Sequence, residues 1–379
     1  MGNLKVGFVL DDTLDTPDGV QQYILTLGKW LSAQGHEVHY LVGHTKRTDI
    51  INVHSLGRNV RVQFNGNRMS TPLPATKRKI RALLERERFD VIHVQIPYSP
   101  FLAQRIIMAA PPEAAIIGTF HIAPNSTSVT MANKILGRLV GKSLRRFDGI
   151  FSVSPAAADF ALKTHGIETS IVPNVVRMEH FKNAKPFTAD PQVPTIVFLG
   201  RLVPRKGCQV LLEAITLLKA DAEIPRFKVV VCGSGPLESE LKAYAKTNGL
   251  DGMVEFAGFV DDNVKARHLK TADITVFPST GGESFGIVLI EAMSAMHPVV
   301  LGADNDGYKT VLAPYADLLF PVLDPISLAN KIKVYLRDEK ARVDALRWQE
   351  AYVRQFDVAN VGKRLVARYQ EVLRSRKQR

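Results

Sequence analysis

Residues 281–291 of this chain read Gly-Gly-Glu-Ser-Phe-Gly-Ile-Val-Leu-Ile-Glu, with carboxylates at Glu283 and Glu291. An apolar run at 274–278 precedes the segment, so the pattern predicts a strand, a glycine loop and a helix. The loop would direct backbone N–H groups at a phosphate. Glu283 and Glu291, the latter about two turns into the helix, are placed to bind hydroxyls at both ends of a sugar nucleotide. An ordinary amphipathic helix with two glutamates is the alternative.

Strand-like runs alternate with helical patterns along most of the chain, which is the rhythm of βαβ units in an open parallel sheet. The first half predicts strands at 6–10, 38–42, 91–95, 116–120 and 150–153 and helices at 20–33 and 77–87. The second half predicts strands at 195–200, 228–232, 254–256, 274–277 and 299–301 and helices at 208–219, 237–247, 264–269 and 288–295. The polar residues 182–194 favour a linker. We therefore expect an α/β protein with two doubly wound domains and a cleft between them.

Size and composition agree with this organisation. The 379 residues are enough for two domains, and 46% hydrophobic with 23% charged residues is typical of a globular protein. The first strand is too short for a signal peptide, and no apolar stretch approaches the roughly 18 to 20 residues of a membrane span. We therefore expect a cytoplasmic protein. The two cysteines, Cys208 and Cys232, offer neither a disulfide framework nor metal-ligand spacing.

Positive charge is concentrated at the two ends of the chain. Residues 1–185 hold 23 lysines and arginines against 14 acids (+9), residues 186–356 hold 19 against 21 (−2), and residues 357–379 hold 7 against 2 (+5). A last helix is expected at 358–374. If it packs on the first domain, that lobe carries nearly all the positive charge and faces an anionic partner.

A second loop with phosphate chemistry follows the strand at 195–200. Arg201 can grip two phosphate oxygens, and Lys206 adds a point charge, which together suit a pyrophosphate. A solvated basic turn is the alternative. Gly233 and Gly235 follow the next strand, and a glycine turn there is by itself a weak signal.

Five segments together resemble one enzyme family over nearly the whole chain. They are 17–21 (Pro-Asp-Gly-Val-Gln), 64–66 leading through 74–79, 119–121 (Thr-Phe-His), 198–207 and 281–288. The pattern resembles the retaining GT-B glycosyltransferases of family 4, and is most similar to the bacterial phosphatidylinositol α-mannosyltransferases. The resemblance implies the GT-B fold. Two Rossmann-like domains, 1–185 and 186–356, would face a central cleft, and residues 357–379 would cross back to complete the first.

The resemblance also implies roles for individual residues. The catalytic group would be His121, Arg201, Lys206 and Glu283. Donor-binding residues would be Gly19, Gly233, Gly235, Asp261, Lys265, Ser284, Phe285, Gly286, Ile287 and Glu291. Acceptor residues would be Asp11, Gln21, Asn65 and Arg68. Asp261 and Lys265 also fit as solvated charges at a helix start, and His93, inside an apolar strand, is expected in the core.

A membrane surface is the expected partner of the basic lobe. Lys77, Arg78, Lys79 and Arg81 share a segment with Ile80, Leu83 and Leu84, an amphipathic basic pattern suited to an anionic interface. Residues 135–147, with Arg138, Lys142, Arg145 and Arg146, form a second candidate. The alternative for either segment is a solvated helix face over a core.

The implied reaction moves a hexose, best mannose from GDP-mannose, to a phosphatidylinositol-type lipid at the inner membrane face. No metal or cofactor is expected, and the anomeric configuration would be retained without a covalent intermediate. A close alternative uses a UDP-sugar (glucose or N-acetylglucosamine) with diacylglycerol, another lipid, or a soluble inositol or polysaccharide acceptor. A nucleic-acid-binding protein is the alternative of another class, because pI ≈ 9.6 invites it.

The sequence departs from the family pattern at four sites, one of which comprises two residues. Asp18 replaces the first of two glycines, Val175 follows Asn174 where glycine is common, and Met296 with His297 replaces a glycine before the last predicted strand. Lys309 stands where a carboxylate is frequent. We expect these positions either to tune the donor or to repack loops.

Overall fold

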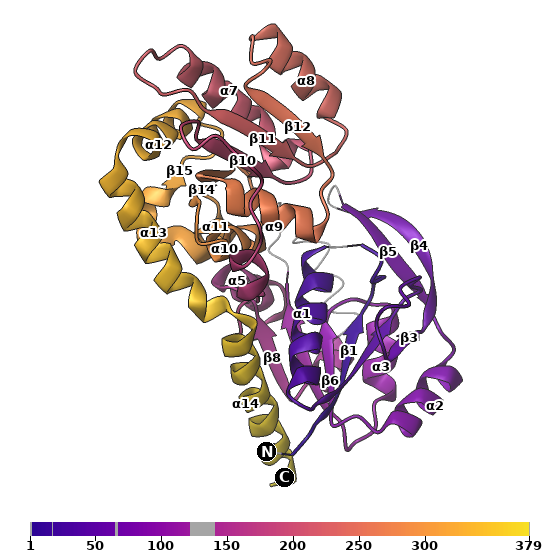
Figure 1. The fold of residues 1–379 in the computed structure, drawn as a ribbon. Helices are drawn as coiled ribbons and strands as arrows, with labels where there is room; N and C mark the ends of the chain where they lie inside the picture. Colours follow the sequence, from indigo (N-terminus) through magenta and orange to yellow (C-terminus); the bar gives the residue numbers. More distant parts are fainter. Residues whose placement is uncertain (1, 17, 65–66, 122–140, 379) are drawn as a thin grey trace. The chain divides into compact units, whose positions relative to one another are not determined.

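The computed structural model describes residues 2–16, 18–64, 67–121 and 141–378, with the side chains of 59–74 outside that description. The chain divides into two compact units, Met1–Val175 with Val358–Arg379, and Val176–Asp357 (Figure 1). The second unit thus begins ten residues before the boundary expected after residue 185. Residues 183–194 contain no helix or strand, as expected of a linker, but they belong to the second unit.

The first unit contains a seven-stranded sheet in the order β3-β2-β1-β6-β7-β8-β9, and all of its pairings are parallel. The strands are β1 (Lys5–Leu10), β2 (Glu37–Val42), β3 (Val53–Ser55), β6 (Val91–Gln95), β7 (Ala115–Phe120), β8 (Gly149–Ser152) and β9 (Ser170–Ile171). The described helices are α1 (Gly19–Ala33), α2 (Lys77–Glu87), α3 (Leu102–Ala109), α5 (Pro155–His165) and α14 (Val358–Lys377). A separate antiparallel pair, β4 (Gly57–Phe64) and β5 (Asn67–Pro74), connects β3 to α2.

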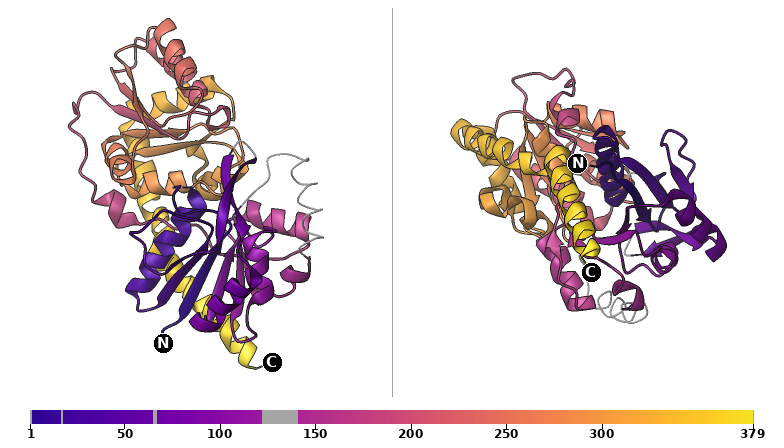
Figure 2. Two further views of the ribbon diagram at one scale, coloured as in Figure 1. Left: turned by 90° about the vertical axis from the view of Figure 1, so that its right-hand side faces the viewer. Right: turned by 90° about the horizontal axis from the view of Figure 1, so that it is seen from below.

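Alternating residues of β1 enter two cores on opposite faces of this sheet. Val6, Phe8 and Leu10 pack with residues of α1 and α14, whereas Val9 packs with residues of α2 and α3. The turned views in Figure 2 show these helices on the two sides of the sheet. A Cβ on Gly362 of α14 would lie 2.4 Å from the Trp30 ring, so close packing on α1 requires this glycine. The last helix therefore completes the first unit, as predicted.

The second unit contains a six-stranded parallel sheet in the order β12-β11-β10-β13-β14-β15. The strands are β10 (Thr195–Leu199), β11 (Lys228–Cys232), β12 (Val254–Gly258), β13 (Ile274–Phe277), β14 (Val299–Ala303) and β15 (Leu319–Phe320). The helices are α6 (Met178–Lys182), α7 (Cys208–Lys219), α8 (Glu238–Thr247), α9 (Asp262–Thr271), α10 (Ile287–Ser294), α11 (Asp306–Leu312), α12 (Pro325–Arg337) and α13 (Glu339–Val353).

The strand order reverses at β10, which pairs with β11 on one side and β13 on the other. In an open α/β sheet the loops at the carboxyl ends of two such strands diverge and leave a crevice for ligands. The loops after β10 and β13 carry Lys206 and Glu283, so the topology brings the two predicted segments together. Among the described residues, no helix is long and apolar enough to cross a bilayer.

Candidate functional site

A carboxylate held by two cations lies where the loops after β10 and β13 meet. One oxygen of Glu283, Oε1, accepts hydrogen bonds from Lys206 Nζ at 2.7 Å, Arg205 Nη1 at 2.8 Å and Ser279 Oγ at 2.8 Å. Burial alone would raise the pKa of Glu283, but the charges of Lys206 and Arg205 outweigh it and hold this pKa below its usual value. Glu283 is therefore ionised, and the two cations are concentrated at one point.

Glycine is required where these loops approach each other. Gly207 has φ +69°, and a Cβ there would lie 2.0 Å from the carbonyl oxygen of Pro278. A Cβ on Gly233 would lie 1.8 Å from the Gly200 oxygen, and one on Gly235 would lie 2.4 Å from the Leu202 oxygen. Gly233 and Gly235 thus pack the turn after β11 against the loop that carries Arg201, whose side chain is exposed. They shape the site through the backbone.

Glu291 forms a second buried ion pair in the same unit. Its Oε1 lies 2.6 Å from Lys265 Nζ, both side chains are 9% exposed, and Lys265 also contacts Asp262 at 2.9 Å. Burial alone would lower the pKa of Lys265, but the charges of Glu291 and Asp262 outweigh it, so this pKa lies above its usual value. Because α10 begins at Ile287, Glu291 is its fifth residue, one turn into the helix; the expected two turns were wrong.

The other predicted donor residues of this unit surround the start of two helices. Gly286 has φ +97° and is the N-cap of α10, and its carbonyl accepts from Leu289 N at 3.0 Å. The N–H groups of Ile287 and Val288 precede this first intrahelical bond. Ser284 and Ile287 are partly exposed beside it, whereas the Phe285 ring is 1% exposed and packs on Phe356. Phe285 can therefore meet a ligand through its backbone alone.

Asp261 has a structural task. Its side chain caps α9 by accepting hydrogen bonds from Asn263 N and Val264 N, each at 2.9 Å. The geometry agrees with the alternative interpretation, in which Asp261 is a charged residue at the start of a helix. Lys265, by contrast, is buried, so the corresponding alternative of a solvated charge is wrong for it.

In the first unit, His121 follows β7 and is 6% exposed. Its Nε2 lies 2.7 Å from Gln95 Oε1, and its ring stands edge-on to Tyr23 at 4.9 Å. Since the amide oxygen of Gln95 accepts, Nε2 carries the proton. Burial lowers the pKa of His121 to about 3, so the imidazole is neutral at physiological pH. His93 is fully buried between Tyr369 and Thr119, which confirms its place in the core.

The two predicted acceptor residues whose side chains the structure describes, Asp11 and Gln21, are both buried. Gln21 is 2% exposed and donates to the Thr13 carbonyl at 3.2 Å. Gly19, predicted to bind the donor, is exposed at the first residue of α1. Asn65 and the side chain of Arg68 lie outside the described residues. Asp11 accepts from Ser99 Oγ at 2.5 Å and from Ala103 N in the first turn of α3 at 2.7 Å.

Asp11 makes a pH-dependent contribution to stability. Burial raises the pKa of Asp11 to about 6, so between the unfolded value near ~4 and about 6 the folded state keeps a proton that the unfolded state has lost. Stability from this group therefore falls as pH rises through that window and is level above it. Asp11→Asn removes this pH dependence. We expect its unfolding free energy, relative to wild type, to rise between pH ~4 and ~6 in urea titrations.

Exposed Asp251→Asn is the matched control and should show no such rise. A difference between Asp11→Asn and wild type that is constant across this pH range would contradict the prediction.

The basic segment 77–81 lies on α2. Lys77, Arg78, Lys79 and Arg81 are exposed. The apolar partners Ile80, Leu83 and Leu84 are at most 5% exposed and pack in the core with residues of α3. The amphipathic interpretation is therefore wrong in one respect: the apolar face covers the protein core and is not available to a lipid interface. Of this segment, only the four exposed cations are available to a membrane surface.

Residues 135–140 of the second basic candidate, with Arg138, lie outside the described residues. Of its remaining cations, Lys142 and Arg145 are exposed, whereas Arg146 donates to the carbonyls of Ile107 at 2.5 Å and Ala110 at 2.9 Å. These hydrogen bonds hold the end of α3 against the segment that contains Arg146.

Comparison with known proteins agrees with this geometry. The family model for glycosyl transferases group 1 matches residues 180–347, and that for glycosyltransferase family 4 matches residues 17–180. The phosphatidyl-myo-inositol mannosyltransferase of Mycolicibacterium smegmatis is 33% identical over 97% of this chain and 94% of its own. The chain belongs to glycosyltransferase family 4. A Propionibacterium freudenreichii protein of the same name is 32% identical over 97% and 94%.

Solved structures of other proteins show the same fold. A glycosyltransferase of Rickettsia africae aligns with a TM-score of 0.74 at 18% identity, over 98% of this chain and 99% of its own. Anabaena HepE in complex with UDP aligns with a TM-score of 0.74 at 16% identity, over 97% and 100%. Two parallel-sheet, Rossmann-like units of the GT-B type are therefore the architecture of this family 4 chain.

The departures from the family 4 pattern have local structural effects. Met296 adopts φ +56°, the left-handed region that glycine occupies most readily. Val175 is buried and ends the first unit, and Lys309 pairs with Asp304 at 3.1 Å. Asp18 is the N-cap of α1 but makes no side-chain capping bond.

Three polar residues near Glu283 were not identified from the sequence. Together with Glu283 and Lys206 they form what we call the Glu283 clamp. Arg205 and Ser279 bind Glu283 directly, and Asn305 donates to the Ser279 carbonyl at 3.0 Å. A signal existed for Arg205, which stands next to Lys206 in the basic loop. Ser279 and Asn305 carry no comparable pattern, because a serine and an N-cap asparagine are common after any strand.

Proposed function

We propose that this chain is a retaining mannosyltransferase that moves mannose from GDP-mannose to a phosphatidylinositol-type lipid at the inner membrane face. One observation carries the proposal. Relatives named phosphatidyl-myo-inositol mannosyltransferase are 30–33% identical over at least 97% of this chain. Such similarity spans both units, so it includes the acceptor half as well as the donor half.

The second unit supplies the groups that a departing nucleoside diphosphate requires. Lys206 and Arg205 converge on one point, Arg201 lies in the same loop, and α10 begins with the N–H groups of Ile287 and Val288, which precede its first intrahelical bond. In the ligand-free chain Glu283 neutralises the two cations. When the diphosphate binds them, the Glu283 carboxylate becomes available to hydroxyls of the sugar. Glu291 keeps its pair with Lys265 through Oε1 and would bind the ribose hydroxyls through its other carboxylate oxygen.

The transfer itself needs no group on the protein to form a bond with the sugar. The bond from the sugar C1 to the diphosphate oxygen breaks, and the acceptor hydroxyl bonds C1 from the same face, which retains the configuration. The hydroxyl proton passes to the departing diphosphate. Closure of the units would keep water from the donor. The neutral His121 would hydrogen-bond the donor sugar without adding charge.

Nucleotide release from a panel of GDP- and UDP-sugars, with and without phosphatidylinositol vesicles, tests this donor and acceptor assignment. We expect release from GDP-mannose that rises with the lipid. Release from a UDP-sugar alone, or release that ignores the lipid, would refute the assignment and leave the transferase family intact.

The positive charge of the first unit supports a membrane surface as partner. Its sequence ranges hold 27 lysines and arginines against 14 acids, a formal charge of +13. Replacing Lys77, Arg78, Lys79 and Arg81 by glutamine should weaken binding to anionic vesicles by up to about a thousandfold, because each cation near such a surface contributes about 1 kcal/mol. Vesicle sedimentation measures this loss, and donor hydrolysis should be unchanged.

A smaller pair of variants controls for net charge. Lys77→Gln with Arg78→Gln removes two charges from α2, and Lys242→Gln with Lys246→Gln removes two exposed charges from α8 of the second unit. Equal weakening by both pairs, or wild-type binding by the fourfold variant, would show that α2 is not the contact surface.

A soluble inositol acceptor is the second candidate. The D-inositol 3-phosphate glycosyltransferase of Jonesia denitrificans is 31% identical, but over 48% of this chain and 43% of its own. Transfer to inositol phosphate that exceeds transfer to the lipid would favour it. Salt-sensitive DNA binding without binding of any nucleotide sugar would instead favour the nucleic-acid alternative.

A further inference from the structure

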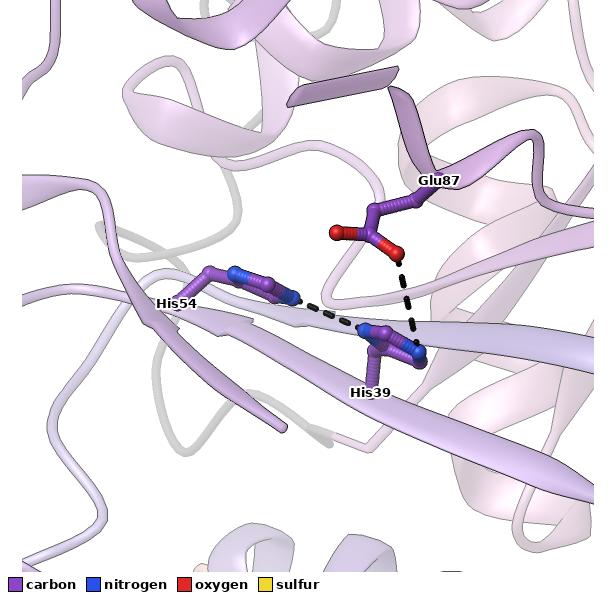
Figure 3. A group of neighbouring side chains, drawn as sticks. All are labelled: His39, His54 and Glu87. Atoms are coloured by element: carbon purple, nitrogen blue, oxygen red, sulfur yellow. Dashed lines mark hydrogen bonds and ion pairs between the residues drawn. The ribbon is translucent and has the colours of Figure 1, made fainter. Parts of the chain in front are cut away.

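Two histidines and a glutamate converge at one edge of the first sheet, in a different unit from the Glu283 clamp. His39 lies on β2, His54 on the neighbouring β3, and Glu87 is the last residue of α2, as Figure 3 shows. One ligand atom from each residue lies within 4.8 Å of the other two. Among the described residues, these three side chains form the group that is close enough together to hold a metal ion.

The hydrogen bonds fix the protons of this cluster. His39 Nε2 lies 2.8 Å from Glu37 Oε1, and a carboxylate accepts, so Nε2 carries the proton. The other nitrogen of His39, Nδ1, then has a free electron pair and accepts from His54 Nε2 at 2.8 Å. The rings are stacked with centroids 5.1 Å apart. The electron pair of His39 Nδ1 therefore points at His54 Nε2.

We propose that His39, His54 and Glu87 form a binding site for a divalent transition-metal ion, best Zn²⁺. Two imidazoles and a carboxylate are ligands that Zn²⁺ commonly takes, with a water in the fourth position. Glu37 stands on the far nitrogen of His39, the arrangement in which a carboxylate orients a metal-bound histidine.

Modest side-chain movement accommodates the ion. Zinc ligands at about 2.0–2.1 Å from the metal lie about 3.3 Å apart in a tetrahedral site, against 2.8 Å between the two histidine nitrogens now. Glu87 Oε2 lies 3.9 Å from His39 Nε2, the nitrogen that faces Glu37, so the carboxylate must turn toward His39 Nδ1 to reach the ion. The proton on His54 Nε2 moves to Nδ1, which keeps the ring neutral and releases no proton.

Lys5 competes with the ion. Its Nζ lies 2.8 Å from both Glu37 and Glu87. Arg86 also pairs with Glu87, at 2.7 Å, so Lys5 and Arg86 now supply the positive charge beside the carboxylates. The side chains of Glu87 and Lys5 are 13% and 21% exposed, and that of Glu37 is 54% exposed, so an ion can enter from solvent. Removing the Lys5 charge should therefore tighten metal binding.

The position of the ligands indicates what the metal would do. His54 precedes the β4–β5 pair, and Glu87 ends α2, the helix that follows it. An ion bound to both and to β2 would clamp the two ends of residues 55–86 to the sheet edge. This segment includes the exposed cations of α2, so the metal would order the surface that we propose contacts the membrane. The metal site itself does not depend on that proposal.

Zn²⁺ titration of the full chain without a histidine tag, in competition with a fluorescent chelator, tests the site. We expect one ion per chain, an affinity at least about tenfold lower in His54→Gln and Glu87→Gln, and a loss of about 10–100-fold in Glu37→Gln. Lys5→Met should bind more tightly. His44→Gln and His268→Gln, outside the cluster, should bind as wild type does.

A second readout separates a site from a folding defect. Zn²⁺ should raise the Tm of wild type and Lys5→Met, but not that of His54→Gln, whose circular dichroism should match wild type. Co²⁺ should give the visible absorption of a tetrahedral ion in wild type but not in His54→Gln. Equal Zn²⁺ stoichiometry and affinity in wild type and His54→Gln, or no binding by wild type, would overturn the proposal.

Discussion

Glu283→Gln should lower turnover by about 10²–10³-fold, while GDP binding stays intact or becomes tighter. The loss is of the order found when one preorganised polar group is removed from a transition state. Glutamine keeps the shape of the side chain but cannot neutralise Lys206 and Arg205. The two cations are then free for the diphosphate, so affinity for the nucleotide is not expected to fall.

Steady-state rates with saturating donor, together with calorimetric titration of GDP, measure the two effects separately. Glu240→Gln on the exposed face of α8 is the matched control and should behave as wild type. Wild-type turnover in Glu283→Gln would contradict the proposed role. A loss of GDP binding without a change in kcat would assign Glu283 to nucleotide binding alone.

Lys265→Met should be the most destabilising single substitution that we propose. It leaves Glu291 buried and without its 2.6 Å partner, and removing one member of a buried pair costs about 3–5 kcal/mol of unfolding free energy. Asp262 loses a contact as well, but keeps Arg177 at 2.6 Å. Urea unfolding followed by hydrogen exchange in α9 and α10 measures the loss where it arises.

The double variant Lys265→Met with Glu291→Leu should regain most of this stability, because neither charge is then buried alone. It should nevertheless lose affinity for the nucleotide sugar if Glu291 binds the ribose. A Lys265→Met protein as stable as wild type would show that Glu291 finds another partner or takes up a proton.

Element positions followed from period and composition, because the buried parallel strands are continuous apolar runs. Each strand predicted in either unit is present within one or two residues of its expected ends. The β4–β5 pair was missed, although an Asn-Gly dipeptide between two runs is a strong hairpin signal. Val60, Val62 and Phe64 also alternate with polar residues, so the period-two signal of a strand was present and was overlooked.

The site was partly predictable for a similar reason. Lys206, Glu283 and Glu291 stand out because charges directly after apolar strands lie at the ligand edge of a parallel sheet. The partner of each charged side chain in this structure depends on tertiary contacts that no local sequence pattern encodes. Thus the Lys265–Glu291 pair joins two helices, and the apolar face of α2 is satisfied by α3 rather than by a membrane.

The central claim is that mannose is transferred to an inositol lipid with retention. Its most direct test is incubation of the purified chain with isotopically labelled GDP-mannose and phosphatidylinositol vesicles, followed by mass spectrometry and anomeric NMR of the lipid. The account predicts one hexose added to the inositol ring in the α configuration, the configuration of the donor. A β-linked product, or label that stays in free mannose while another donor modifies the lipid, would contradict it.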